Sequence, residues 1–252
     1  MGSYNGVEIE EYARIAAAED DHWWYRGTRA LVAQLLAPWL DRASPERTQI
    51  LDAGCGPGGN GAWLARHGHV TGVDLAQEAL EFVRARRPET APVRGGLDAL
   101  PLADSCIDVV VAITVLYSVP DDISAVHELA RVLRPGGAVL VVEPAFEALR
   151  RAHDRTVHGL RRYRRHPLAR RFAAAGLEVQ RATYAYSFLA PPAAVLGLLE
   201  RRAESGGEHR SDLERRPLDR VFAPLGSLER RWLARRNVLL GSSVVVLATL
   251  PT

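Results

Sequence analysis

The sequence predicts an α/β fold with a doubly wound, mostly parallel sheet of seven strands. Short apolar runs alternate with amphipathic segments from residue 48 to residue 144. This alternation is typical of strand–helix–strand units, whose right-handed crossovers give a parallel sheet. A glycine-rich stretch follows the first apolar run at 54–59, where such sheets bind ligands. Two further apolar runs, at 176–188 and 242–250, are expected to complete the sheet.

Composition limits the class of protein. The chain has 252 residues, 47% hydrophobic and 25% charged, which suits one domain with a large core. A net charge of +2 does not imply a nucleic-acid partner. Two cysteines cannot build a disulfide framework. Without a signal pattern or a run of about 18 apolar residues, we expect a cytoplasmic protein without a membrane partner.

The elements up to residue 144 follow from hydrophobic periodicity. Residues 10–40 have apolar residues at helical spacing, with a break expected near Gly27. The apolar run at 106–115 is continuous, as in a strand buried on both faces. The remaining predicted strands are 48–54, 69–74, 91–96 and 138–144, and the predicted helices are 59–67, 76–86 and 121–133.

The pattern changes after Pro144. Residues 146–171 are rich in arginine and are predicted to be helical, and 187–241 are predicted to form an irregular helical insertion. Tyr184 and Tyr186 alternate in the strand at 176–188, so we expect both rings on one face, in the core or in a substrate wall.

The glycine loop has two interpretations. Gly54, Gly56 and Gly59 fit the G-x-G-x-x-G pattern of dinucleotide-binding loops. Gly54, Gly56 and Gly58, preceded by Asp52, fit G-x-G-x-G after an acid, which indicates a smaller ligand. Asp74 ends the next strand, where a carboxylate can accept hydrogen bonds from a ribose in either case. The loop alone leaves both ligands open.

Four ordered segments resemble the class I S-adenosylmethionine (SAM)-dependent methyltransferases, of the small-molecule, type 11-like kind. They are LDAGCGPG (51–58), GVDLA (72–76), LDALPLADSCIDVVVAITVLYSV (97–119) and ELARVLRPGGAVLVVEP (128–144). The resemblance runs from about residue 19 to residue 185 and includes the terminal strand. It implies a Rossmann-like sheet whose last strand is antiparallel, with SAM as cofactor and S-adenosylhomocysteine as product.

The resemblance also divides the single domain. Its parts are an N-terminal helical lid (1–45), a SAM-binding core (46–145), a substrate-side segment with a helical insertion between the last two strands (146–241) and the terminal strand (242–252). In the insertion Leu218, Val221, Phe222, Leu225, Leu228 and Trp232 have near-helical spacing. This face is expected to roof the substrate pocket, to form a homodimer contact or to pack on the sheet.

Cofactor-binding residues are implied by position in the family motifs. They are Arg26, Asp52, Gly54, Cys55, Gly56, Asp74, Leu75, Gly96, Leu97 and Ile113. In this assignment Asp74 holds the ribose, Leu75 packs on adenine and Ile113 bounds the sulfonium side. Gly96 replaces an acid found in many relatives, so adenine recognition is expected from the backbone of Leu97 or from Asp98.

Arg26 belongs to EDDHWWYRGTRAL (19–31), which resembles an aromatic and arginine-bearing lid helix in many relatives. Its guanidinium suits the cofactor's carboxylate. In the alternative interpretation, Trp23 and Trp24 are core residues and Arg26 is a surface charge.

Candidate catalytic residues are Tyr117, His153, Asp154 and His158, and candidate substrate-binding residues are Tyr117, Arg162 and Tyr163. On a helix Asp154, His158 and Arg162 would share one face, and the carboxylate would raise the pKa of His158. The spacing of the two histidines does not suit a metal site, and none is expected. The alternative is a solvated, arginine-rich helix.

The predicted function is methyl transfer from SAM to an oxygen or nitrogen of a small organic molecule, such as a bacterial secondary metabolite. One alternative is an RNA or peptide methyltransferase that uses the arginine-rich stretch. The other is a SAM-binding protein of this fold that catalyses a different reaction.

Overall fold

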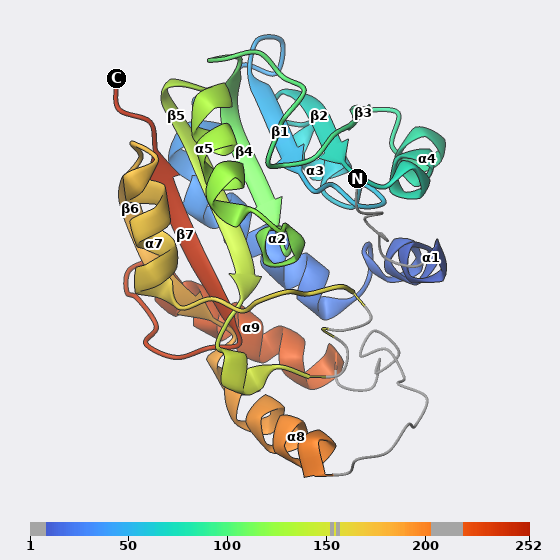
Figure 1. Ribbon diagram of the computed structural model, residues 1–252, viewed down its shortest axis with the longest axis vertical. Helices are drawn as coiled ribbons and strands as arrows, with labels where there is room; N and C mark the ends of the chain where they lie inside the picture. Colours follow the sequence, from blue (N-terminus) through green and yellow to red (C-terminus); the bar gives the residue numbers. More distant parts are fainter. Residues whose placement is uncertain (1–8, 152–153, 155–156, 203–218) are drawn as a thin grey trace.

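The computed structural model has one seven-stranded sheet in the order β3-β2-β1-β4-β5-β7-β6 (Figure 1). It describes residues 9–151, 154, 157–202 and 219–252. The strands are β1 (Gln49–Ala53), β2 (His69–Asp74), β3 (Thr90–Arg94), β4 (Ile107–Ile113), β5 (Leu133–Pro144), β6 (Glu178–Ala185) and β7 (Ser243–Thr249). Strands β1 to β5 pair in parallel, and β7 lies antiparallel between β5 and β6. The predicted fold class is confirmed.

Helices cover both faces of the sheet. They are α1 (Ile9–Ala18), α2 (Trp23–Leu40), α3 (Gly61–Leu64), α4 (Gln77–Arg86), α5 (Asp122–Val132), α7 (Arg165–Ala174), α8 (Ala190–Arg202) and α9 (Asp219–Leu233). Successive residues of β4 point to opposite faces. Val110 packs in the core cluster that contains Leu129 of α5, and Val111 packs in the cluster that contains Leu36 of α2. Among the described helices, none combines the length and the apolar character needed to cross a membrane.

The N-terminal helical region breaks at residues 19–22 and not near Gly27 as expected. His22 caps α2 by accepting a hydrogen bond from the backbone N–H of Trp24 at Nδ1 (3.3 Å). Gly27 lies inside α2, where a Cβ would be 3.4 Å from the hydroxyl of Tyr186. This glycine therefore allows close packing and does not end the helix.

The helix predicted over 146–171 is not continuous. Among the described residues of this range, the 3-10 turn Glu147–Leu149, Asp154 and the first residues of α7 are helical, whereas 157–164 form a turn and an extended segment. Phe146 and His158 have φ values of 54° and 53°, a left-handed conformation that a right-handed helix cannot include. Tyr163 then pairs with Ala145 next to the end of β5.

Tyr184 and Tyr186 lie on opposite faces of the sheet, contrary to the expectation from alternation. Tyr184 stacks on Phe146 with ring centroids 4.7 Å apart, whereas Tyr186 contacts Trp23 of α2. Strand β6 ends at Ala185, and Tyr186 has a left-handed φ of 58°. The strand periodicity therefore does not extend to Tyr186. Both rings are core residues.

Candidate active site

A cavity of about 840 Å³ opens at the carboxyl ends of the central strands. The strand order reverses between β1 and β4, which is the switch point where open α/β sheets bind ligands. The walls of the cavity come from the glycine loop after β1, the loops after β2, β3 and β4, the lid helices α1 and α2, and Val157 and His158.

The glycine loop turns back on the sheet. Gly54, Gly56 and Gly58 have φ values of 70°, 51° and 95°, which favour glycine. The backbone N–H groups of Gly54 and Cys55 donate to the carbonyl of Val73 in β2 (2.8 and 3.0 Å). A Cβ at Gly54 would collide with Val115. These contacts hold the loop close to the cavity.

Asp74 is fixed at the cavity wall by backbone donors. Its Oδ2 accepts from the N–H of Gly56 (2.9 Å), and its Oδ1 accepts from the N–H of Ala76 (3.0 Å). Burial raises the pKa of Asp74, and the bonds from Ala76 and Gly56 oppose that shift. The carboxylate therefore links the glycine loop to the start of α4.

Asp52 lies near the glycine loop but is not among the residues that line the cavity. It is 1% exposed, and its Oδ1 accepts from Asn60 Nδ2 at 3.1 Å. The Oδ2 atom is buried without a hydrogen-bond partner. Burial raises the pKa of Asp52 to about 7. Asp52 therefore supports the loop through Asn60. Its carboxyl group can change charge near neutral pH.

The loop after β3 forms another wall with Gly96, Leu97 and Asp98. Leu75 also lines the cavity and is 38% exposed, so its side chain is accessible to a ligand there. Arg94 lines the same region, and its Nε donates to the carbonyl of Leu75 at 3.1 Å. The predicted cofactor residues Gly54, Cys55, Gly56 and Ile113 also line the cavity.

The lid contributes Arg29 to the cavity, whereas Arg26 is not a lining residue. Nη1 of Arg29 donates to the carbonyl of Gly59 (3.4 Å), and Nη2 donates to the carbonyl of Asp20 (3.5 Å). Both arginines were visible in the lid sequence, but the choice between them depends on the rotation of α2. Tyr12, Trp24 and Tyr25 of the lid also line the cavity.

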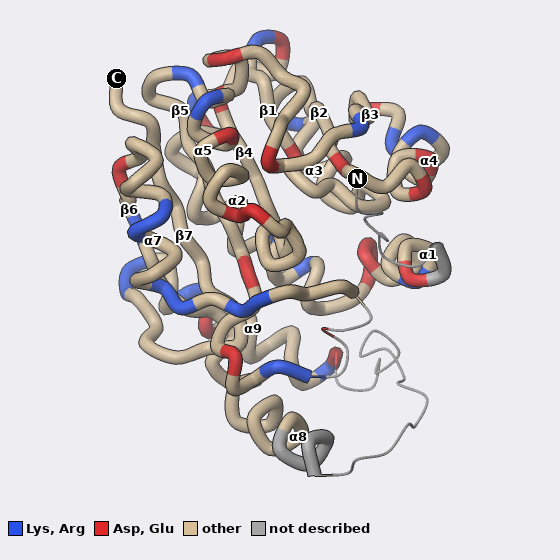
Figure 2. The backbone as a smooth tube through the Cα atoms, in the orientation of Figure 1, with Lys and Arg blue, Asp and Glu red and all other residues tan. Residues whose placement is uncertain are grey.

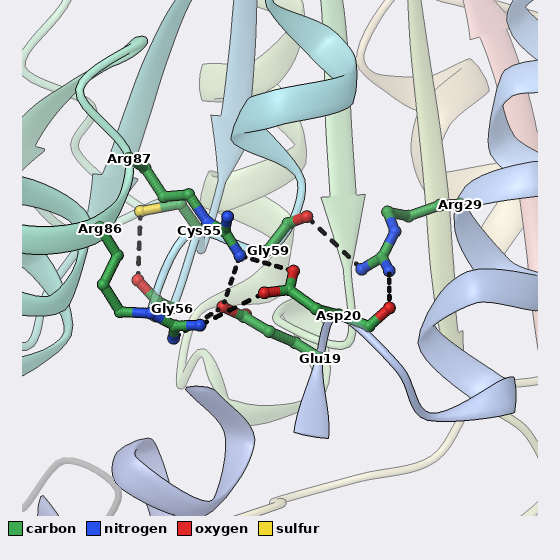
Figure 3. A network of polar contacts seen from close by, with 8 residues as sticks. All are labelled: Glu19, Asp20, Arg29, Cys55, Gly56, Gly59, Arg86 and Arg87. Carbon is green, nitrogen blue, oxygen red and sulfur yellow. Dashed lines mark hydrogen bonds and ion pairs between the residues drawn. The ribbon is translucent and has the colours of Figure 1, made fainter. Parts of the chain in front are cut away.

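An ionic network joins the lid to the end of α4 (Figure 3). Oε1 of Glu19 pairs with Arg86 (3.3 Å) and Arg87 (3.4 Å). Asp20 pairs with the same arginines at 3.3 and 2.6 Å. Burial raises the pKa of Glu19, and the two arginines oppose the shift. Sequence analysis assigned no role to these four residues.

Tyr117 reaches the cavity from a 3-10 turn after β4, Leu116–Ser118. Buried Glu143 at the end of β5 accepts from the N–H groups of Val115 (3.2 Å), Leu116 (2.9 Å) and Tyr117 (3.2 Å). Burial raises the pKa of Glu143 to about 8, against the effect of these bonds. Burial also raises the pKa of Tyr117, so its phenol stays protonated and can donate a hydrogen bond.

The predicted Asp154–His158–Arg162 arrangement does not form. Asp154 is buried and pairs with Arg162 through two contacts of 2.9 Å. Tyr163 donates its hydroxyl to Asp122 (2.6 Å) and to the carbonyl of Leu116 (3.0 Å). Of the post-β5 candidates in the described residues, His158 alone lines the cavity. His153 lies outside the described residues.

The described part of the insertion does not roof the cavity. None of residues 187–202 and 219–241 is a lining residue. Phe222 packs against the α2 face of the core, whereas Val221, Leu225, Leu228 and Trp232 are exposed. Leu218 lies outside the described residues. Figure 2 marks charged residues along α9, of which Arg220 and Arg231 are exposed.

Cys55 lies in the glycine loop and lines the cavity. Cys55 is buried, and burial raises its pKa well above the ordinary value, so its thiol is not activated. Within the described part of the chain, no three His, Cys, Asp or Glu side chains gather closely enough to hold a metal ion.

Comparison with known families matches residues 51–141 to the methyltransferase domain model. A probable S-adenosylmethionine-dependent methyltransferase of Mycolicibacterium smegmatis is 34% identical over 131 residues, 52% of this chain and 49% of that protein. A malonyl-[acyl-carrier protein] O-methyltransferase of Pectobacterium atrosepticum is 38% identical over 95 residues, 36% of each chain. The match thus spans half or less of these relatives.

Among solved structures, a TehB-like SAM-dependent methyltransferase from Corynebacterium glutamicum superposes with a TM-score of 0.58 and 20% identity. The alignment covers 96% of this chain and 97% of that one. At this identity the likeness establishes the fold.

Proposed function

We propose that this chain, whose residues 51–141 match the methyltransferase domain model, is a class I SAM-dependent methyltransferase that transfers the methyl group of SAM to an oxygen or nitrogen of a small organic molecule. The observation that carries the proposal is the cavity at the switch point. It brings the glycine loop, Asp74 and the lid to one space. One of the relatives is named as an O-methyltransferase, which supports oxygen as the acceptor atom in this proposal.

The residues present fit an adenosyl cofactor. Asp74 is already oriented by two backbone bonds and supplies a carboxylate for the ribose hydroxyls. Half-exposed Leu75 and buried Leu97 supply apolar surface for adenine, with Asp98 at the same wall. Arg29 supplies a cation for the carboxylate of the methionine end, in place of Arg26. Bound there, SAM would supply an electrophilic methyl group.

Residues of the chain then have to align the acceptor and exclude water, because methyl transfer from a sulfonium requires mainly an in-line approach. Tyr117 donates a hydrogen bond and orients the acceptor. Its raised pKa argues against service as a base. His158 lines the same cavity, and we assign its imidazole the role of general base. Asp154 and Arg162 hold the segment that carries His158.

The acceptor class follows from the remaining walls. Tyr12, Trp24, Tyr25, Tyr117 and Val157 give aromatic and apolar surface to this lining, beside polar residues that include Thr28, Ser118 and His158. Of the two lining arginines, Arg29 is assigned to the cofactor's carboxylate, and Arg94 donates to the backbone carbonyl of Leu75 at the proposed adenine wall. This composition favours an uncharged or weakly acidic aromatic molecule, as in secondary metabolism, and disfavours a phosphorylated one.

The RNA or peptide alternative relied on free arginines in the post-β5 segment. Arg161 and Arg171 pair with Asp122, and Arg162 pairs with Asp154. Arg150 donates to the carbonyl of Gly159 at 2.6 Å. These arginines connect elements of the fold, so the small-molecule proposal is the better supported one.

Calorimetric titration with SAM and with S-adenosylhomocysteine tests the cofactor. Radiolabelled SAM offered with panels of phenols, carboxylic acids and amines then tests methyl transfer. We expect stoichiometric binding and acceptor-dependent formation of S-adenosylhomocysteine. Absence of SAM binding would refute the proposal. An acceptor that is converted without S-adenosylhomocysteine release would favour a different reaction on this fold.

A further inference from the structure

Glu19 is a buried carboxylate that lines the cavity beside the glycine loop. It stands at the break between α1 and α2, is 2% exposed and lines the cavity. Both of its ion pairs, with Arg86 and Arg87, use Oε1. Its Oε2 lies against Gly59 so closely that a Cβ on that glycine would collide with it.

Arg29, a cation, contacts the same glycine through a hydrogen bond to its carbonyl. Its Nη1 donates to the carbonyl of Gly59, and it lines the same cavity (Figure 3). A carboxylate and a guanidinium of the lid, from Glu19 and Arg29, therefore lie against the same residue of the glycine loop. A ligand group that carries an ammonium and a carboxylate on one carbon matches such a pair.

We infer that Glu19 binds the α-ammonium group of the cofactor's methionine end through Oε2, while Arg29 takes the carboxylate. This inference rests on the proposed function and adds a binding residue to it. The lid then becomes part of the cofactor site, because its position over the loop is fixed by Arg86 and Arg87 through Oε1 of the same carboxylate.

The arrangement also explains the last two glycines of the loop. A Cβ at Gly58 would lie 2.9 Å from Cγ of Arg87, and a Cβ at Gly59 would collide with Glu19. Gly58 and Gly59 therefore leave room for the lid network, whereas Gly54 and Gly56 shape the cavity beside Asp74. A larger residue at 59 would displace the ammonium-binding carboxylate.

The test compares two ligands that differ in the methionine end. S-adenosylhomocysteine carries the amino acid group, and 5′-methylthioadenosine keeps the adenosine and the sulfur but lacks that group. Titration calorimetry with both ligands is carried out on the wild-type chain, on Glu19→Gln and on Glu81→Gln. Glu81 is an exposed acid on α4 and serves as the matched control.

Glu19→Gln is expected to weaken S-adenosylhomocysteine binding about 10- to 100-fold, the cost of one charge-assisted hydrogen bond. It should leave 5′-methylthioadenosine binding unchanged, and Glu81→Gln should change neither. If Glu19→Gln fails to fold, Arg29→Gln, which removes the partner cation, should show the same ligand dependence.

The inference would be overturned if Glu19→Gln lost equal affinity for both ligands, or lost affinity for neither. A wild-type chain that binds both ligands equally tightly would also overturn it, although the adenosine pocket would then stand. A wild-type chain that binds neither would refute the proposed function itself.

Discussion

At the scale of single residues, Asp74 shows how the loop and the cofactor pocket depend on one side chain. Its two oxygens accept from Gly56 and Ala76, so both need to be acceptors. Asp74→Asn places an NH2 group against one of these N–H donors and removes the charge. We expect S-adenosylhomocysteine affinity to fall by about 1.5–3 kcal/mol in titration calorimetry. Unchanged affinity would contradict the ribose assignment.

Asp52 gives the chain a pH-dependent stability. Its folded pKa of about 7 lies above the ordinary value of 3.8. Between these values the folded state binds more protons than the unfolded state, so stability falls as the pH rises. Asp52→Asn keeps an oxygen to accept from Asn60 and removes this titration. Urea unfolding should show the wild type losing about 2 kcal/mol relative to the variant from pH 5 to pH 7. If the free energy of unfolding changed equally with pH in the wild type and in the variant, Asp52 would not titrate in this range.

Which charged residues reach the cavity was only partly predictable. Asp74 was placed correctly at the wall because it ends a strand, and strand ends meet at one edge of a parallel sheet. Arg29 and Glu19 could not be distinguished from Arg26 and Asp20 by sequence, because the difference is one of helix rotation and of where the helix breaks. Asp154 pairs with Arg162 across a turn, a contact that helical spacing could not anticipate.

At the scale of elements, the strands were predictable because they are buried. The predicted segment 69–74 has the same bounds as β2, and 106–115 contains β4. Continuous apolar runs such as β4 and β7 leave few alternatives. The segment after β5 was not predictable, because arginine favours helices locally while Phe146 and His158 adopt left-handed conformations that tertiary contacts maintain.

The 3-10 turn after β4 depends on one acid of β5. Glu143 is fully buried and accepts three backbone N–H groups, from Val115, Leu116 and Tyr117. Glu143→Ala leaves these donors without their acceptor, which costs about 3 kcal/mol or more of unfolding free energy. Urea denaturation checks this, with Glu178→Ala, an exposed acid at the start of β6, as control. Equal losses in both variants would show that the turn is held by other contacts.

At the scale of the whole molecule, the site joins segments far apart in the sequence. The lid helices come from the N-terminus, the wall proposed for the adenosyl group from the loops after β1, β2 and β3, and the wall proposed for the acceptor from the loop after β4 and from residues 157–158. Residues 190–202 and 219–233 form helices beyond the sheet end (Figure 1). The lid lines the cavity and is joined to the end of α4 by ion pairs, and so a bound ligand should stabilise the assembled chain.

Ligand binding to the folded state alone adds about 2.7 kcal/mol of stability at a ligand concentration of 100 times Kd. For a chain of this size, each kcal/mol raises Tm by about 2–4 °C. Saturating S-adenosylhomocysteine should therefore raise Tm by about 5–10 °C in a thermal melt. NAD⁺ at the same concentration is the dinucleotide control and should leave Tm unchanged. A shift with NAD⁺ and none with S-adenosylhomocysteine would return the glycine loop to the dinucleotide interpretation.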